Sequence, residues 1–432
     1  MQKFSRREWL ANAATLMPSA LLPGLLASAA AADPQAGGLP RVRAITKGPK
    51  HHWFGYYDKL QFDTTGRRVL GMEVDFEHRS PRIDDEIGIG FVDLGDTDAS
   101  GMPRWVEVGK SRAWGWQQGC MLQWRPGSTD EILWNDRDGD RFVCHVLNLT
   151  TGAKRTLPMP VYTVAPDGRT AFTIDFGRLQ RMRPGYGYAA APPAGGHLPR
   201  PDDIGIWRMD LDTGAHDLVV SIAEIAAFEP DETGVGKNHW FNHLLVSPDS
   251  NRLEFLHRWN HRGFTTRMLT MNADGTDRYV LDQGGLTSHF IWRDPGHILA
   301  WAKPVGRTLG FWVFRDKTHD VEQVGEGVMT ENGHCTYLSD RDGQPGTRWI
   351  LNDTYPDSRR LQHPYLFEIA TGRKAPLGSF ETPDAYSGEW RCDTHPRSGR
   401  DGMVVCIDSP IGDSAQGGDG RQMHLIDISA VV

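Results

Sequence analysis

The feature that most limits how this chain can fold is a unit that recurs seven times after residue 45. Each unit has a short apolar strand, a turn rich in Pro, Asp and Gly, a second and more apolar strand, and a later hairpin. A sheet of this size cannot bury both of its faces alone, so the units must stack around a common axis. The pattern predicts an all-β fold, a seven-bladed β-propeller of four-stranded blades. The first turns fall at 63–66, 126–127, 165–168, 247–250, 293–296, 340–343 and 396–399.

Composition agrees with this architecture and limits the partners. The 432 residues include 48 Gly and 27 Pro, which favours many short strands joined by tight turns. A net charge of −8 disfavours a general nucleic-acid binder, which needs a basic surface. No composition shift divides the chain after residue 45, so we expect one domain at 46–432, preceded by a linker at 33–45.

The first 32 residues have the pattern of a twin-arginine signal peptide. Arg6 and Arg7 precede Trp9 and Leu10, and a mildly apolar stretch follows that is too short for a stable membrane span. We therefore expect export to the periplasm or the medium, with no membrane span in the mature protein. The five cysteines are far apart in the sequence, which predicts mainly buried structural thiols and leaves one or two disulfides open.

Histidines recur at one position of consecutive units. Aligned on the first turns, His243, His289 and His334 each precede the turn by four or five residues, at the start of the innermost strand. The last unit has Asp393 and His395 at a similar place, and residues i and i+2 of a strand share a face. Imidazoles and a carboxylate that converge from neighbouring blades predict a divalent-metal site.

Loops that follow the second strands return to the same end of the propeller. The longest, from residue 178 to about residue 203, is rich in Arg and Tyr, and long loops of this kind often bind ligands or act as lids. Aromatic rings beside cations suit sugar rings that carry carboxylates. The predicted substrate-binding residues are Tyr57, Gln118, Arg178, Asp353 and Arg359.

One part of the sequence resembles a known family. The segments 256–259, 266–268, 272–275 and 287–292 resemble the middle of the oligogalacturonate lyases, seven-bladed propellers of polysaccharide lyase family 22. The resemblance covers roughly 238–408. It implies that His289 is a manganese ligand and that Asp393 and His395 occupy the positions of two further ligands. A carboxylate in place of one imidazole, with Glu389 as a substitute for a Gln ligand, would shift the preference toward calcium.

The resemblance implies a lyase that cleaves a linkage to a uronic acid by β-elimination. A metal ion or an arginine neutralises the uronate carboxylate, a base removes the neighbouring proton, and an acid protonates the leaving oxygen. The expected partner is a uronate-containing oligo- or polysaccharide, and the expected cofactor is manganese or calcium. A glycoside hydrolase and a non-catalytic periplasmic binding propeller remain as alternatives. The role candidates are His257 and His243 as base, Arg258 and Arg267 as neutraliser, Tyr186 and Tyr188 as acid, and His289, His334, Asp393 and His395 as metal ligands.

Overall fold

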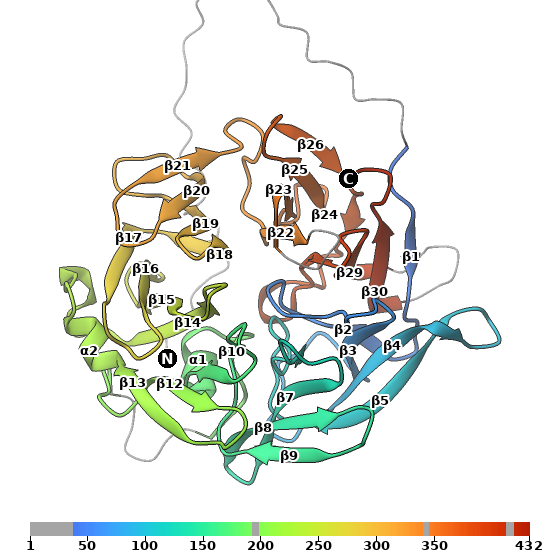
Figure 1. Cartoon of the computed structure of the whole chain (residues 1–432), viewed down its shortest axis with the longest axis horizontal. Coiled ribbons are helices and arrows are strands. Elements are labelled where there is room, and N and C mark those ends of the chain that lie inside the picture. Colours follow the sequence, from blue (N-terminus) through green and yellow to red (C-terminus); the bar gives the residue numbers. More distant parts are fainter. Residues whose placement is uncertain (1–37, 192–197, 340–344, 412–418) are drawn as a thin grey trace, which may run out of the picture. The chain divides into compact units, whose positions relative to one another are not determined.

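The computed structural model describes residues 38–191, 198–339, 345–411 and 419–432. Within these residues, seven four-stranded antiparallel sheets are arranged around a central axis, and a two-stranded sheet accompanies the sixth (Figure 1). The predicted seven-bladed propeller is therefore confirmed. The signal segment 1–32 and the turn 340–343 lie outside the described residues.

The first three blades follow the chain from the inside outwards. Blade 1 has β2 (His51–Trp53), β3 (Arg68–Val74), β4 (Ile87–Thr97) and β5 (Pro103–Ser111). Blade 2 has β6 (Gln123–Trp124), β7 (Glu131–Asp138), β8 (Arg141–Asn148) and β9 (Lys154–Leu157). Blade 3 has β10 (Thr163–Val164), β11 (Thr170–Thr173), β12 (Gly205–Asp210) and β13 (His216–Ser221).

Blades 4 to 6 repeat this order. Blade 4 has β14 (His239–Val246), β15 (Arg252–Trp259), β16 (Thr265–Asn272) and β17 (Tyr279–Gly285). Blade 5 has β18 (Thr287–Asp294), β19 (His297–Ala302), β20 (Gly310–Arg315) and β21 (Val321–Val324). Blade 6 has β22 (Thr336–Ser339), β23 (Pro345–Asn352), β25 (Tyr365–Glu368) and β26 (Arg373–Pro376), beside the pair β24 (Leu361–Gln362) and β27 (Phe380–Glu381).

The last blade joins the two ends of the described chain. Its strands β28 (Arg397–Ser398), β29 (Val404–Ile411) and β30 (Asp419–Asp427) come from the C-terminal part, and β1 (Val42–Ala44) forms the outer edge. β1 pairs antiparallel with β30, with Val42 opposite Ile426. Residues 42–44 belong to the stretch expected to be a linker, and this pairing makes them the closing strand of the propeller.

Helices occupy only a few connections. The helix α1 (Phe176–Met182) follows β11, and α2 (Ile222–Ala227) follows β13. Asp175 caps α1 by accepting from the backbone N–H of Arg178, and Ser221 forms a capping box with Glu224 on α2. Two short 3-10 helices are η1 (Glu232–Gly234) and η2 (Gly388–Trp390). None of the helices in the described part of the chain has the length and apolarity needed to cross a membrane.

Alternation along the second strand of each blade builds the core. In β19, Ile298 and Ala300 pack toward blade 4, whereas Leu299 and Trp301 pack toward blade 6. Successive side chains of a strand point to opposite faces, so one apolar strand serves two interfaces between blades. This explains why the second strands are continuous runs of apolar residues in the sequence. All five cysteines are buried and free, so no disulfide forms.

The turns of the repeat have the predicted chemistry. The Asp63 carboxylate accepts from the backbone N–H groups of Arg67 and Arg68, and Gly66 has a φ of 68°, which favours glycine. At the opposite end, Asp408 of β29 pairs with Arg397 and accepts from the backbone of Gly55. This buried ion pair therefore ties the last blade to the segment that follows β2, the inner strand of the first blade.

Candidate functional site

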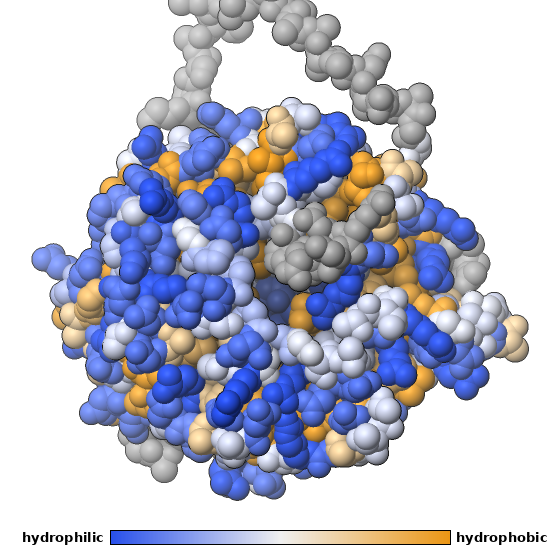
Figure 2. Space-filling view, in the orientation of Figure 1, coloured by the Kyte–Doolittle hydropathy of each residue, from blue (hydrophilic) through white to orange (hydrophobic). Residues whose placement is uncertain are grey.

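Four histidines from consecutive blades meet at the axis. His243 and His289 belong to β14 and β18, and His334 and His395 lie two residues before the first residues of β22 and β28. The ring centroids of His243 and His289 are 5.9 Å apart, and those of His289 and His334 and of His334 and His395 are each 4.2 Å apart. The positional repeat in the sequence therefore corresponds to a continuous cluster of imidazoles. The face shown in Figure 2 is hollowed and hydrophilic where the blades meet.

Irregular backbone places these rings. The register of β14 against β15 shifts between Asn242 and Leu245, and His243 within this bulge has a φ of 52°. The register of β18 also shifts between Thr287 and Phe290, beside His289, and His395 has a φ of 40°. Bulges and left-handed backbone at non-glycine residues are concentrated at functional sites.

A buried carboxylate orients His334. The Asp353 carboxylate accepts from the backbone N–H of His334 at 2.7 Å and lies 3.0 Å from its Nδ1. It also accepts from the hydroxyl of Thr394 at 2.6 Å. The preceding residue is Gly333, where a Cβ would lie 1.9 Å from the carbonyl oxygen of Asp353. Because Nδ1 donates to Asp353, Nε2 of His334 is directed to the other side of the ring.

The pKa values separate His334 from the other three histidines. Burial opposes the charged form of His334, but the negative charge and hydrogen bonds of Asp353 outweigh it and raise the pKa of His334. Burial lowers the pKa of His243, His289 and His395 well below the ordinary value, and neighbouring positive charges lower it further. These three rings are therefore neutral near pH 7 and can accept protons or bind a cation.

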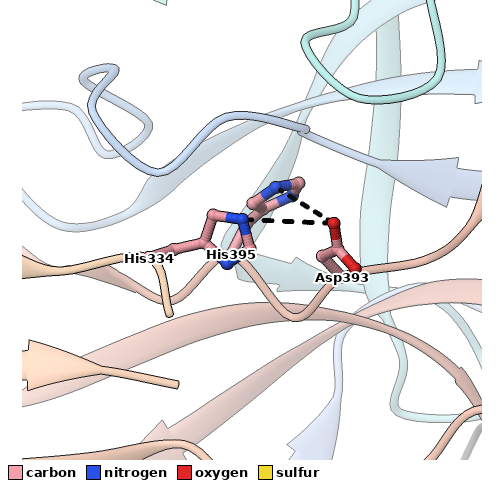
Figure 3. A group of neighbouring side chains, drawn as sticks. All are labelled: His334, Asp393 and His395. Carbon is pink, nitrogen blue, oxygen red and sulfur yellow. Dashed lines mark ion pairs between the residues drawn. The ribbon is translucent and has the colours of Figure 1, made fainter. Parts of the chain in front are cut away.

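Three of these side chains form a candidate metal centre. Ligand atoms of His334, Asp393 and His395 lie within 4.8 Å of one another, and both ring nitrogens turn toward the Asp393 carboxylate (Figure 3). Nε2 of His334 is 4.0 Å and Nε2 of His395 is 3.9 Å from Oδ2 of Asp393. Both nitrogens are buried and have no hydrogen-bond partner among the described residues. Two orphaned imidazole nitrogens beside a carboxylate fit a divalent transition metal.

His289 stands beside this group. Its Nδ1 lies 3.1 Å from the side-chain oxygen of Asn332, whose amide nitrogen donates to Ser288. Nδ1 therefore carries the proton, and the lone pair of Nε2 is available to a ligand. The sequence did not single out Asn332, because it lies in a loop between blades with no strand periodicity.

A second group links a tyrosine to the metal candidates. Arg391 donates from Nε to Asp393 at 2.7 Å and from Nη2 to the hydroxyl of Tyr186 at 2.7 Å. Burial would raise the pKa of Tyr186, but the positive charges of Arg391 and Arg183 lower it to about 8. Tyr186 can therefore donate a proton near neutral pH, and Arg391, which was not predicted, holds it in place.

Tyr56 also contacts the histidine cluster. Its hydroxyl lies 2.7 Å from Nδ1 of His243, and its ring lies 5.4 Å from that of His395. It follows the short strand β2, where the sequence shows neighbouring aromatic residues but not which of them faces the axis. Tyr57, a predicted substrate-binding residue, packs 5.5 Å from His334, but its hydroxyl bonds the backbone of Phe290. Tyr57 therefore packs against the histidine cluster, and its hydroxyl is not free to bind a substrate.

Gln118 also supports the cluster. It donates to the hydroxyl of Tyr162 at 2.8 Å, and that hydroxyl in turn accepts from the backbone N–H of His243. The chain of hydrogen bonds stabilises the bulge that carries His243. Gln118 is therefore placed to position the site, whereas the sequence predicted a direct contact with substrate.

The structure separates His257 and Arg267 from the axis. His257 bonds His239 at 2.8 Å and accepts from Nε of Arg267 at 3.0 Å, and Arg267 caps the carbonyl of Ile225 in α2. Neighbouring residues of β15 point to opposite sides. Arg258, the next residue, instead lies near the loop of Tyr186, and burial together with the charge of Arg183 lowers its pKa to about 9.

Tyr188, Arg178 and Arg359 occupy structural or remote positions. Tyr188 stacks on Phe176 at 4.2 Å, and burial raises its pKa well above the ordinary value, which makes it a poor acid. Arg178 donates to the backbone carbonyls of His239, Leu198 and Pro199. Arg359 has 73% of its side chain exposed and pairs with Asp357.

Glu389 does not join the metal candidates. Its carboxylate accepts from the hydroxyl of Ser80 and from the amide of Gln180 at 2.9 Å, and its carbonyl accepts from Gln117. Glu389 lies in η2, which precedes the last blade, and its hydrogen bonds connect loops of three blades. The substitution of Glu389 for a metal ligand is therefore wrong for this geometry.

The fold and the site define a seven-bladed propeller with a histidine and carboxylate centre on its axis. No protein-family model and no curated protein sequence matches the chain. Among solved structures, an oligogalacturonate lyase from Vibrio parahaemolyticus is similar, with a TM-score of 0.62, 14% identity, and coverage of 90% of this chain and 94% of the other. An oligogalacturonate lyase in complex with manganese has the same TM-score and identity, with coverage of 90% and 93%. At this identity the likeness shows the fold.

Proposed function

We propose that the protein is a lyase that cleaves a linkage to a uronic acid by β-elimination. The observation that carries the proposal is the convergence of four imidazoles with Asp393, Arg391 and Tyr186 at one place on the axis. The solved lyases of the same fold support it. A hydrophilic site with neutral bases, a proton donor and cations has the groups that elimination beside a carboxylate requires.

The proposed cation site is made of His334, Asp393 and His395, and the ring centroid of His289 lies 4.2 Å from that of His334. A bound divalent ion would act as a Lewis acid that neutralises the substrate carboxylate. The donors are mainly imidazole nitrogens, which disfavours calcium, an ion that prefers oxygen ligands, and an oligogalacturonate lyase of the same fold was solved in complex with manganese. The orphaned nitrogens of His334 and His395 support this choice.

The chain's own residues supply the proton transfers. His243 is neutral and accepts the proton on the carbon next to the carboxylate. The electron pair of that C–H bond forms the new carbon–carbon double bond while the glycosidic C–O bond breaks. Tyr186 donates its proton to the leaving oxygen, and Arg391 stabilises the phenolate that remains. We also propose that the protein acts outside the cytoplasm after twin-arginine export.

The arrangement of carboxylates disfavours the hydrolase alternative. A glycoside hydrolase needs two carboxylates about 5–10 Å apart that are free to act on substrate. Asp175 caps α1, Asp408 pairs with Arg397, and Asp353 is bonded to His334. A purely binding propeller would use the same surface without turnover.

The test is a screen of uronate polymers for the ultraviolet absorbance of an unsaturated uronate product, because neither hydrolysis nor binding yields that product. We expect activity with the wild type and a loss of at least about 100-fold in kcat for His243→Ala and for His289→Ala. The control is His216→Ala, on the outer strand of blade 3. Wild-type rates in both site variants, or no product from any uronate polymer, would refute the proposal.

A further inference from the structure

An exposed aromatic ring near the site is in contact with two guanidinium groups. Phe264, in the loop between β15 and β16, is 38% exposed. The guanidinium carbon of Arg183 lies 4.8 Å from its ring centroid, and that of Arg258 lies 4.9 Å away. The edge of Phe264 is fixed by a T-shaped contact with Trp240 at 6.1 Å. The ring is therefore held in place although much of it faces solvent.

The two cations lack the partners that cations usually have. Neither Arg183 nor Arg258 forms an ion pair with any carboxylate of the described residues. Arg258 is only 3% exposed and has two hydrogen bonds, to the hydroxyl of Thr266 and to the carbonyl of Thr287. Nε of Arg183 is buried without a partner. A buried, unpaired charge is unfavourable, so an anionic ligand at this place would stabilise the protein.

Contacts connect this place to the proposed proton donor. Arg183 lies 5.0 Å from the ring of Tyr186, and Tyr186 is bonded to Arg391, which pairs with Asp393. The Arg183 guanidinium thus contacts both the exposed ring of Phe264 and the ring of the proposed proton donor. The sequence offered Arg258 as a candidate and placed Arg183 in the long loop rich in Arg and Tyr, but it gave no role to Phe264.

We propose that Phe264, Arg183 and Arg258 form a subsite that selects a carboxylated pyranose over a neutral one. The apolar face of the sugar stacks on Phe264, and its carboxylate pairs with the two guanidinium groups. This inference rests on the proposed function, since it names the residues that recognise the charge of the substrate. It adds that a second carboxylate, apart from the one at the reacting carbon, is recognised outside the histidine cluster by guanidinium groups and not by a metal ion.

The experiment measures the binding of D-glucuronate and D-glucose to the purified protein by titration calorimetry, with a chelator present. We expect the wild type to bind glucuronate at least about tenfold more tightly than glucose. Arg183→Gln should weaken glucuronate binding about tenfold and leave glucose unchanged, and Arg183→Lys should restore part of the loss. Phe264→Leu should weaken both sugars. Arg183 and Phe264 are partly exposed, so replacing them should leave the fold intact. Arg258 is buried, so its replacement would also destabilise the protein and is a less suitable test.

The matched control is Arg181→Gln, which removes the same charge two residues earlier, in the last turn of α1. Equal binding of the two sugars by the wild type would overturn the proposal. It would also be overturned if Arg183→Gln kept wild-type affinity for glucuronate, or if Arg181→Gln lost as much. A protein that discriminates between these sugars but forms no unsaturated product contradicts the lyase proposal alone, so the two failures are distinguishable.

Discussion

Asp353 shows how one carboxylate can set the role of a neighbouring ring. It is fully buried, and the charge of His334 and several hydrogen bonds offset the effect of burial and lower its pKa. Because it holds Nδ1 of His334, it directs Nε2 toward Asp393. Partners of this kind fix the tautomer and the orientation of metal-binding histidines.

We therefore expect Asp353→Asn to weaken manganese binding about 10- to 100-fold, because the amide holds the His334 ring less firmly. Titration calorimetry with manganese chloride measures the effect without any substrate. Asp357→Asn, four residues along the same loop, is the control and should bind manganese as the wild type does. Unchanged affinity in Asp353→Asn would show that the carboxylate has only a structural role.

His243 and His257 should respond differently to truncation. His243→Ala removes the proposed base, so kcat should fall at least about 100-fold while the protein stays folded. His257→Ala breaks the bonds to His239 and Arg267, so the free energy of unfolding should fall by about 2–3 kcal/mol while kcat changes little. Urea denaturation and the product assay measure the two effects, and the opposite pattern would reverse the assignment.

Tyr186 gives the site a specific dependence on pH. Its pKa is lowered to about 8, and only the protonated phenol can donate to the leaving oxygen. Activity should therefore fall as the pH rises through about 8. Tyr186→Phe should remove this alkaline limb together with most of the rate. A profile that rises through the same range would identify Tyr186 as the base.

The residue level also shows where sequence reasoning succeeded and where it failed. The four histidines could be predicted because the repeat assigns them one position in each blade. His257 was grouped with Arg258 because both end a second strand, but alternation sends them to opposite sides of β15. Arg391 and Asn332 were missed because they lie in irregular segments, where spacing does not determine direction.

At the level of elements, loops from different blades are tied together by Glu389. Its carboxylate contacts Ser80 of the loop after β3 and Gln180 of α1, and its carbonyl accepts from Gln117. Strand spacing in the sequence predicted the blades, because period-two alternation and Asp–Gly turns are local signals. These ties could not be predicted, because they join residues up to 309 positions apart.

We expect Glu389→Ala to raise KM about threefold to tenfold and to change kcat less than twofold, because the loops that carry Tyr186 and Arg391 lose a shared support. Steady-state kinetics separates the two constants, and limited proteolysis should detect faster cleavage in these loops. The control is Glu381→Ala, an exposed residue of β27. An equal loss in both variants would exclude a specific role for Glu389.

At the level of the whole molecule, a ligand that binds only the folded ring should stabilise it. With manganese at about 100 times its dissociation constant, linkage adds about 2.7 kcal/mol to the free energy of unfolding. We expect a rise in Tm of a few degrees, measured by calorimetry and reversed by a chelator. The double variant His334→Ala and His395→Ala should show no rise, and an equal rise there would place the ion elsewhere.

Closure of the ring by β1 and β30 fixes an order of events during biosynthesis. His52, in the inner strand β2 of blade 1, bonds Gln422, which lies 370 residues later. During synthesis, β1 has no partner strand until β30 has left the ribosome, when almost all of the polypeptide has been made. Contacts between residues this distant in sequence also form slowly. A truncated translation product would thus leave two open sheet edges, which makes it a target for proteases and prone to aggregation.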